Sequence, residues 1–300
     1  MIRIGVDFGG TKIEVAAIDE RGAFRARVRA PNPGDYDTAL ITVRDLVAEA
    51  ERKAGARLAS VGIGMPGSIS PRTGLIRGSN SVWLNGRTFK QDLEATLERP
   101  LRLENDANCF ALSEASDGAA AGKRVVFGAI LGTGCGGGVV VDGRTIMGHN
   151  GMAGEWGHSP LPWPKPEEYR AHQCWCGRFD CLETWTSGSA FCADYEALSG
   201  QKLGGEAIVA AARAGKPAAV KALDNYVDRL GRGLAAMCDL IDPDAIVLGG
   251  GMSNTAELYA RLPAAVAPHV FSDIFETPIV QAMHGDSSGV RGAAWLWPLE

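Results

Sequence analysis

The 300-residue sequence is 46% hydrophobic, and its formal net charge is −5 with a pI near 5.6. This length predicts one large or two ordinary domains with a substantial core. The acidic balance and the lack of a Lys/Arg run argue against nucleic acid or an anionic membrane as partner, so small-molecule chemistry is expected. The N-terminus has no signal-peptide pattern, and no uncharged apolar stretch reaches about 18 residues, which predicts a cytoplasmic protein.

Residues 4–19 predict a β-hairpin, because two apolar runs flank an acid and a Gly-Gly turn. Such a turn lets backbone N–H groups approach phosphate oxygens, and Asp7 beside it is a candidate Mg²⁺ ligand. Gly-Gly turns also occur in hairpins that bind nothing, so the motif alone leaves both interpretations open. The candidate phosphate-binding residues of this turn are Gly9, Gly10, Thr11 and Lys12.

The same hairpin pattern occurs a second time, since residues 128–142 align with 5–19 without a gap. Two copies predict two similarly built lobes, each offering a glycine turn to one shared nucleotide cleft. The second copy has Ile130 where the first has Asp7, so the hairpin does not need an acid there to fold, which favours a functional role for Asp7. The second candidate phosphate turn consists of Gly132, Thr133 and Gly134.

Between the two hairpins, strands alternate with helices, which predicts an α/β fold. Gly67 lies in a loop that can contact a ligand, and a further loop at 78–86 contains Asn80. An ordinary surface connection is the alternative for that second loop. The predicted elements are strands at 24–30, 61–65 and 101–104 and helices at 37–54 and about 109–121.

Asp106 is the candidate catalytic base, because it follows a predicted strand between the amides Asn105 and Asn108. A carboxylate at this place can accept a proton from an alcohol that attacks a phosphoryl group. An Asx-turn or helix N-cap is the structural alternative. Both can hold together, because a cap position also fixes the side chain.

Residues 149–190 form a long insertion with little periodicity. A loop of this length is usually held by a cross-link or has a function. Three cysteines fall within eight residues, and with His158 or His172 they would complete a tetrahedral zinc site that organises the loop. A redox pair is the alternative, but the third thiol favours zinc. The candidate cysteine ligands are Cys174, Cys176 and Cys181.

Two acids, Glu155 and Glu183, flank this cysteine-rich segment and are candidates for binding hydroxyl groups, with solvent-facing acids as the alternative. Helices are expected at 205–214 and 217–240, and a buried strand from 245 ends in Gly249, Gly250 and Gly251. That third glycine turn suits a nucleoside, although it could also be a plain strand-to-helix connection. The predicted lobes are 1–121, joined by a C-terminal helix at 288–300, and 122–287.

These motifs together resemble the ROK family of the actin-like ATPase superfold, over essentially all 300 residues. The resemblance implies a two-lobed, ribonuclease H-like α/β fold with a duplicated β-hairpin core and a zinc-stapled loop. One departure is Asp180, because the family usually has Gly before the third cysteine. The motifs that carry the resemblance are 7–11, 105–108, 132–134, 154–158, 174–183 and 249–251.

The resemblance implies an ATP-dependent hexose kinase in which Asp106 is the general base for the sugar 6-hydroxyl. It also implies that His158 is a zinc ligand, in preference to His172. Mg²⁺ and the phosphates would be held by Asp7 and the turns 9–12 and 132–134, and the nucleoside by 249–251. The implied sugar-binding residues are Gly67, Asn80, Asn105, Asp106, Glu155, His158 and Glu183.

Within the family, the segments 67–71, 80–86 and 284–298 look most like bacterial fructokinases, which predicts fructose as substrate, with mannose possible. The segment 105–115 is shared with N-acetylglucosamine kinases, so such a kinase, or a glucokinase, is the alternative. A sugar-sensing repressor is a distant alternative, since it needs an N-terminal helix-turn-helix and this sequence starts on a strand at Ile2. A polymerising actin-like ATPase would leave the cysteine-rich loop unexplained. Dimers are common in similar kinases, so a homodimer is expected.

Overall fold

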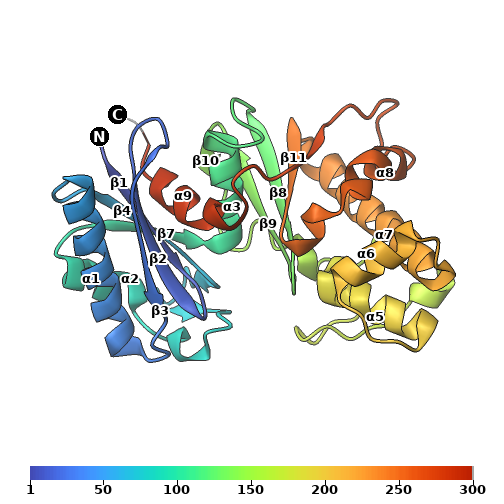
Figure 1. Cartoon of the computed structure of the whole chain (residues 1–300), viewed down its shortest axis with the longest axis horizontal. Coiled ribbons are helices and arrows are strands. Elements are labelled where there is room, and N and C mark those ends of the chain that lie inside the picture. Colours follow the sequence, from blue (N-terminus) through green and yellow to red (C-terminus); the bar gives the residue numbers. More distant parts are fainter. Residues whose placement is uncertain (299–300) are drawn as a thin grey trace. The chain divides into compact units, whose positions relative to one another are not determined.

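The computed structural model describes residues 1–298, which form two compact units (Figure 1). Unit 1 contains residues 1–122, 138–154 and 284–298, and unit 2 contains 123–137 and 155–283. The assignment of 138–154 to unit 1 is a feature that the sequence did not predict. The division into two lobes with the predicted boundaries stays a prediction, with residues 1–121 and 288–300 in one lobe and residues 122–287 in the other. Within residues 1–298, no helix is both long enough and apolar enough to cross a bilayer.

The first sheet is built around the N-terminal hairpin, and its strand order is β3-β2-β1-β4-β7. The hairpin predicted from residues 4–19 is confirmed, because β1 pairs antiparallel with β2 and places Asp7 opposite Glu14. β4 and β7 then extend the sheet in parallel with β1. The strands are β1 (Arg3–Phe8), β2 (Lys12–Ile18), β3 (Phe24–Pro31), β4 (Ser60–Met65) and β7 (Leu101–Asn105).

The second sheet repeats this plan with the order β10-β9-β8-β11-β12. In both sheets the strand that comes first in the chain lies in the centre, two strands of a meander lie on one side, and two parallel strands lie on the other. The shared order supports the duplication read from the two glycine hairpins. The strands are β8 (Val125–Leu131), β9 (Cys135–Val141), β10 (Arg144–Thr145), β11 (Ala245–Gly249) and β12 (Ile279–Gln281).

Helices cover both faces of the first sheet (Figure 1). On one face lie α1 (Tyr36–Ala54) and α2 (Phe89–Leu97), whose apolar residues join the β1–β4 core. Asp35 caps the start of α1 by accepting a hydrogen bond from the Thr38 N–H at 3.0 Å, and Gly55 ends the helix with φ 64°. The other face is covered by α9 (Ser288–Trp295), which packs against α3 (Asp106–Ser116).

Glycines in the strands let α9 approach the sheet closely. A β-carbon at Gly5 would lie 1.9 Å from the Val290 carbonyl oxygen, and one at Gly62 would lie 1.8 Å from that of Ala293. No other residue fits at this separation. The helix predicted at 288–300 ends at Trp295, while residues 299–300 lie outside the described part. The helix predicted at about 109–121 also differs, because the Asn105 side chain caps it earlier and it ends at Ser116.

In unit 2 the long helix α7 (Pro217–Ile241) packs mainly against α5 (Gly188–Ser199), α6 (Gly205–Arg213) and α8 (Ala256–Val266). Pro217 suits the first turn of α7, where its missing N–H leaves no hydrogen bond unmade. The remaining short elements are β5 (Ser68–Ile69), β6 (Ile76–Arg77), α4 (Glu183–Thr186) and the 3₁₀ turns η1 (Val82–Leu84), η2 (Trp156–His158), η3 (Pro166–Glu168), η4 (Gly251–Asn254) and η5 (Gly285–Ser287).

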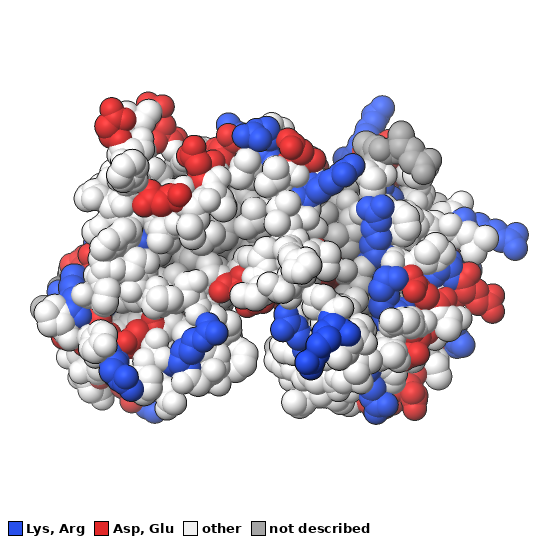
Figure 2. Space-filling view, turned by 180° about the vertical axis from the view of Figure 1, so that it is seen from behind, with Lys and Arg blue, Asp and Glu red and all other residues white. Residues whose placement is uncertain are grey.

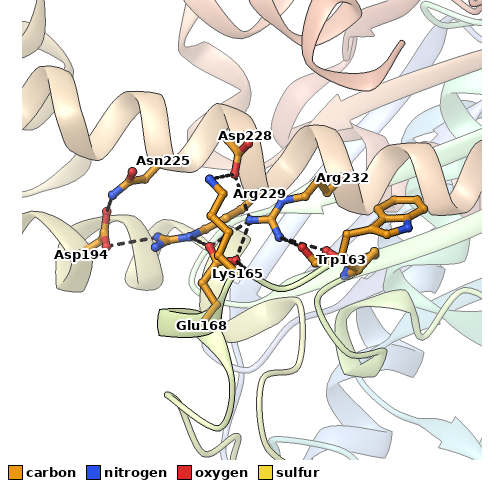
Figure 3. A network of polar contacts seen from close by, with 9 residues as sticks. Trp163, Lys165, Glu168, Asp194, Asn225, Asp228, Arg229 and Arg232 are labelled. Carbon is orange, nitrogen blue, oxygen red and sulfur yellow. Dashed lines mark hydrogen bonds and ion pairs between the residues drawn. The ribbon is translucent and has the colours of Figure 1, made fainter. Parts of the chain in front are cut away.

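A polar network ties the long insertion to α7 (Figure 3). The Arg232 guanidinium is 2% exposed and donates hydrogen bonds to both carboxylate oxygens of Glu168 at 2.9 Å and to the Trp163 carbonyl at 2.9 Å. Arg229 donates to the same carboxylate at 3.0 Å. Burial raises the pKa of Glu168, but these hydrogen bonds outweigh it and leave the pKa below its ordinary value.

On the face shown in Figure 2, acidic and basic side chains are interspersed, and neither sign forms one continuous stripe. This mixture fits a net charge of only −5 in 300 residues.

Candidate functional site

The carboxyl ends of β1, β4 and β7 bring the predicted residues of unit 1 to one edge of the sheet. Asp7 on β1 lies opposite Gly64 on β4, and Met65 at the end of β4 lies opposite Asn105 at the end of β7. The loop with Gly67 and the start of α3 at Asp106 therefore leave the sheet at the same edge. In α/β proteins this edge is where ligands bind.

Asp106 is exposed, at the first position of α3. The Asn105 side chain caps the helix by accepting a hydrogen bond from the Ala107 N–H at 2.9 Å, and its amide donates to the Gly67 carbonyl at 3.1 Å. The same Ala107 N–H lies 2.8 Å from Oδ1 of Asp106. The cap and the candidate base are thus neighbours, and the local hydrogen bonds orient the carboxylate without burying it.

Asp7 is only partly exposed. Burial raises its pKa to about 6, and the negative charges of Asp106 and Glu14 add to the effect. A divalent cation beside Asp7 would offset this repulsion, and a carboxylate oxygen is the ligand type that Mg²⁺ prefers. The residues of this edge therefore fit a Mg²⁺ ion.

The turn between β1 and β2 exposes Gly10 and Thr11. Lys12 is less available, because its ammonium group lies 3.3 Å from the Glu14 carboxylate. Asn80 is also exposed. The Asn85 side chain fixes this loop, because it accepts a hydrogen bond from the Ser79 N–H at 3.0 Å and donates one to the Ser79 carbonyl at 2.9 Å.

Unit 2 contains a pocket with a volume of about 1030 Å³. Of the predicted nucleotide-binding residues, Gly132, Thr133 and Gly251 line it, whereas Gly134, Gly249 and Gly250 are not among its lining residues. The parallel pairing of β8 with β11 places the two glycine turns side by side at the carboxyl ends of those strands. The pocket wall supplied by α5 and α6 was not predicted from the sequence. That wall includes Gly188, Ser189, Cys192, Gly205, Glu206 and Val209.

Four side chains of the long insertion form a compact cluster in unit 2. Their ligand atoms all lie within 4.8 Å of one another. Sγ of Cys174 lies 3.7 Å from Nδ1 of His158, and Sγ of Cys176 lies 3.5 Å from that of Cys181. Zinc bonds of about 2.0–2.3 Å would place tetrahedral ligand atoms about 3.5–3.8 Å apart, so the cluster fits Zn²⁺. His172 instead packs against Trp185 at 4.3 Å between ring centroids.

Asp180, which stands where the resemblance implies glycine, adopts the left-handed backbone conformation, with φ 58°. Its buried carboxylate accepts hydrogen bonds from the backbone N–H groups of Arg170 and His172, the latter at 3.0 Å. Asp tolerates this conformation better than most residues, and these bonds compensate for the strain. The departure from glycine is therefore compatible with the cluster.

The 154–158 segment lies against the second glycine hairpin. A β-carbon at Gly157 would lie 2.0 Å from the Cys135 carbonyl oxygen, and the Trp156 indole donates to the Gly136 carbonyl at 2.8 Å. Glu183 reaches the same hairpin, because one of its carboxylate oxygens accepts a hydrogen bond from the Cys135 N–H at 3.0 Å. Glu155 is exposed beside them.

A family model described as the ROK family matches residues 3–300. The chain belongs to the ROK family. An N-acetyl-D-glucosamine kinase from Pectobacterium atrosepticum is 41% identical over 298 residues, which is 97% of each chain. An N-acetylgalactosamine kinase from Shewanella sp. is 39% identical over 295 residues, or 97% of this chain and 95% of that one. The crystal structure of a ROK hexokinase from Thermus thermophilus matches with a TM-score of 0.88 and 32% identity, covering 99% of this chain and 97% of that one.

Proposed function

We propose that this ROK-family sugar kinase transfers the terminal phosphoryl group of ATP to the 6-hydroxyl of N-acetyl-D-glucosamine. The support is full-length similarity to kinases that are named for N-acetylated hexosamines, at 41% and 39% identity. The expectation of fructose from the segments 67–71, 80–86 and 284–298 is not supported. Short segments are a weak guide to the sugar, because single groups distinguish these substrates.

The observation that carries the catalytic part of the proposal is the exposed Asp106 at the capped start of α3. As the 6-hydroxyl attacks the terminal phosphorus, Asp106 accepts its proton, which makes the oxygen a better nucleophile. Asn105 keeps the carboxylate in place through the cap and its bond to Gly67. Mg²⁺ held at Asp7 would neutralise phosphate charge. The proposed sugar contacts are Gly67, Asn80, Asn105, Glu155, His158 and Glu183.

The nucleotide is proposed to occupy the pocket of unit 2, with its phosphates toward the turn Gly132–Gly134. The turn Gly9–Lys12 of unit 1 is proposed as a further phosphate-binding turn. Backbone N–H groups in glycine turns bind phosphate oxygens at close range.

Zn²⁺ is proposed to be structural, because Cys174, Cys176, Cys181 and His158 supply four ligands and leave no open position. A homodimer and a cytoplasmic location stay predictions.

The sugar preference is tested by measuring kcat/KM with saturating Mg²⁺–ATP for N-acetylglucosamine, N-acetylgalactosamine, glucose, mannose and fructose. We expect N-acetylglucosamine to give the highest value. A clear preference for N-acetylgalactosamine would instead indicate an N-acetylgalactosamine kinase, like the relative from Shewanella sp.. A preference for fructose or glucose would overturn the N-acetylhexosamine proposal while leaving a hexose kinase.

The role of Asp106 is tested with Asp106→Asn. This change removes the proton acceptor but keeps the shape, so kcat should fall about 10²–10⁴-fold while the affinity for the sugar is largely kept. Asp45→Asn, at an exposed carboxylate on α1, is the matched control and should leave kcat unchanged. Undiminished turnover in Asp106→Asn would refute the assignment.

A further inference from the structure

Trp175 stands out in unit 2 because a large aromatic side chain between two clustered cysteines is 76% exposed. Its neighbours Cys174 and Cys176 both belong to the compact ligand cluster, so its backbone is held from both sides. Exposing an indole to water forfeits the free energy that burial would give. An aromatic ring held rigidly in this way is typical of a ligand-contacting residue.

The indole is also fixed in orientation by two contacts with residues that are proposed to bind sugar hydroxyls. Its N–H donates a hydrogen bond of 2.6 Å to Oε1 of Glu183. Its ring meets the His158 ring edge to face, at 4.9 Å between centroids and 82° between planes. The Glu183 carboxylate is thereby held at both oxygens, by Trp175 at Oε1 and by the Cys135 N–H at Oε2.

We propose that Trp175 is a further sugar-contacting and specificity-determining residue, which orients Glu183 and offers its indole to the apolar C–H face of the pyranose ring. A pyranose has hydroxyls around its edge and C–H groups on its faces, so carboxylates at the edge and an aromatic ring on a face complement each other. An acetamido methyl group adds apolar surface for the same ring. This inference rests on the proposed function, in which Glu183 and His158 contact the sugar.

A purely structural role would have different consequences. If Trp175 only stabilised the cysteine cluster, replacing it would lower the metal content and raise the KM values for the sugar and for ATP alike. If it contacts the sugar, replacing it should raise the KM for the sugar, leave the KM for ATP unchanged, and leave the metal bound. The two roles are therefore separable by kinetics together with metal analysis.

The experiment compares Trp175→Ala and Trp175→Phe with the wild type. Trp175→Ala should raise the KM for N-acetylglucosamine about 10-fold, and Trp175→Phe, which keeps an aromatic ring but loses the N–H, by about 3-fold. The KM for ATP should stay within about twofold of wild type in both variants. Mass spectrometry of the native proteins should find one zinc ion per chain. Trp163→Phe, at a second exposed indole of the same unit, is the control and should change neither KM.

Indole fluorescence gives a readout that does not need turnover. N-Acetylglucosamine alone should change the emission of the wild type and of Trp163→Phe but not that of Trp175→Phe. An unchanged sugar KM in Trp175→Ala, or a loss of zinc with both KM values raised, would overturn the inference. If the wild type phosphorylates no N-acetylhexosamine, the proposed function itself fails, and the sugar panel detects that separately.

Discussion

Asp7 and Asp106 reach the same edge of the first sheet from two different strands, and each has its own constraint. Asp106 is exposed and oriented by the helix cap, whereas Asp7 is partly buried. Burial together with the charge of Asp106 raises the pKa of Asp7 to about 6. An acid that is costly to ionise in the folded protein is typical of a functional site, where stability is lost in exchange for binding.

The cost of ionising Asp7 predicts a pH-dependent stability. In metal-free protein the folded state binds this proton more tightly than the unfolded state, where the pKa is near 3.8. The free energy of unfolding should therefore fall as pH rises from about 4 to about 6, by at most about 3 kcal/mol. The free energy of unfolding of Asp7→Asn should not show this decrease between pH 4 and 6, so the variant should be more stable than wild type at pH 7. Chemical denaturation across pH measures this.

Asp45→Asn controls for the loss of a carboxylate as such, because Asp45 is largely exposed on α1. Its stability profile should follow that of wild type. If Asp7→Asn were as stable as wild type at pH 7 and kept the same slope between pH 4 and 6, the raised pKa of Asp7 would be wrong.

At the scale of elements, two groups of interactions hold the cysteine-rich insertion in place. The cluster of three thiols and His158 holds its second half, and the Glu168–Arg232 network fixes its first half to α7 (Figure 3). The carboxylate of Glu168 and the guanidinium of Arg232 are both almost fully buried. A buried ion pair is costly to break from one side, because the remaining charge stays out of water.

Arg232→Met should therefore destabilise the protein by about 3–5 kcal/mol, since it leaves the Glu168 carboxylate buried with only Arg229 and backbone partners. Lys165→Met is the matched control, because it breaks an exposed ion pair with Asp228 and should cost at most about 1 kcal/mol. Denaturant unfolding measures both. Equal, small losses in the two variants would contradict a stabilising role for the buried pair.

At the scale of the whole molecule, the pocket proposed for the nucleotide belongs to one unit alone. Its lining residues come from 131–133, 188–213 and 251–255, all within unit 2. The proposed base, Asp106, belongs to unit 1. Nucleotide binding should thus be possible without the acceptor sugar.

Amide hydrogen exchange tests this. A non-hydrolysable ATP analogue with Mg²⁺, added without sugar, should slow exchange in the segments 131–133, 188–213 and 251–255, because ligand contact suppresses local opening. The helix 36–54 in unit 1 should be unaffected. Protection that develops only after sugar is added would contradict a nucleotide pocket complete in unit 2.

Several features of the fold were predictable because their causes are local. The two glycine hairpins were recognised since the strand pattern and turn residues of a hairpin are contiguous in sequence, and the shared strand order agrees with them. The cap that precedes the proposed base is predictable for the same reason, because a strand end, an N-cap and an acid follow one another at 105–106. The end of α3 was predicted five residues too far, at 121 rather than 116, since fraying helix ends carry weak signals.

The sequence alone determined the α/β duplication, the glycine turns and the three-cysteine motif, because each follows from residues that are neighbours along the chain. Residue spacing left His158 and His172 open as partners of the cysteines, the family resemblance favoured His158, and the tertiary structure brings His158 to the cluster. Gly157 packs on the Cys135 carbonyl and thereby brings His158 to Cys174, whereas His172 packs on Trp185. The α5–α6 wall of the pocket and the Trp175–Glu183 contact also depended on folding, since they join segments whose proximity no local spacing encodes.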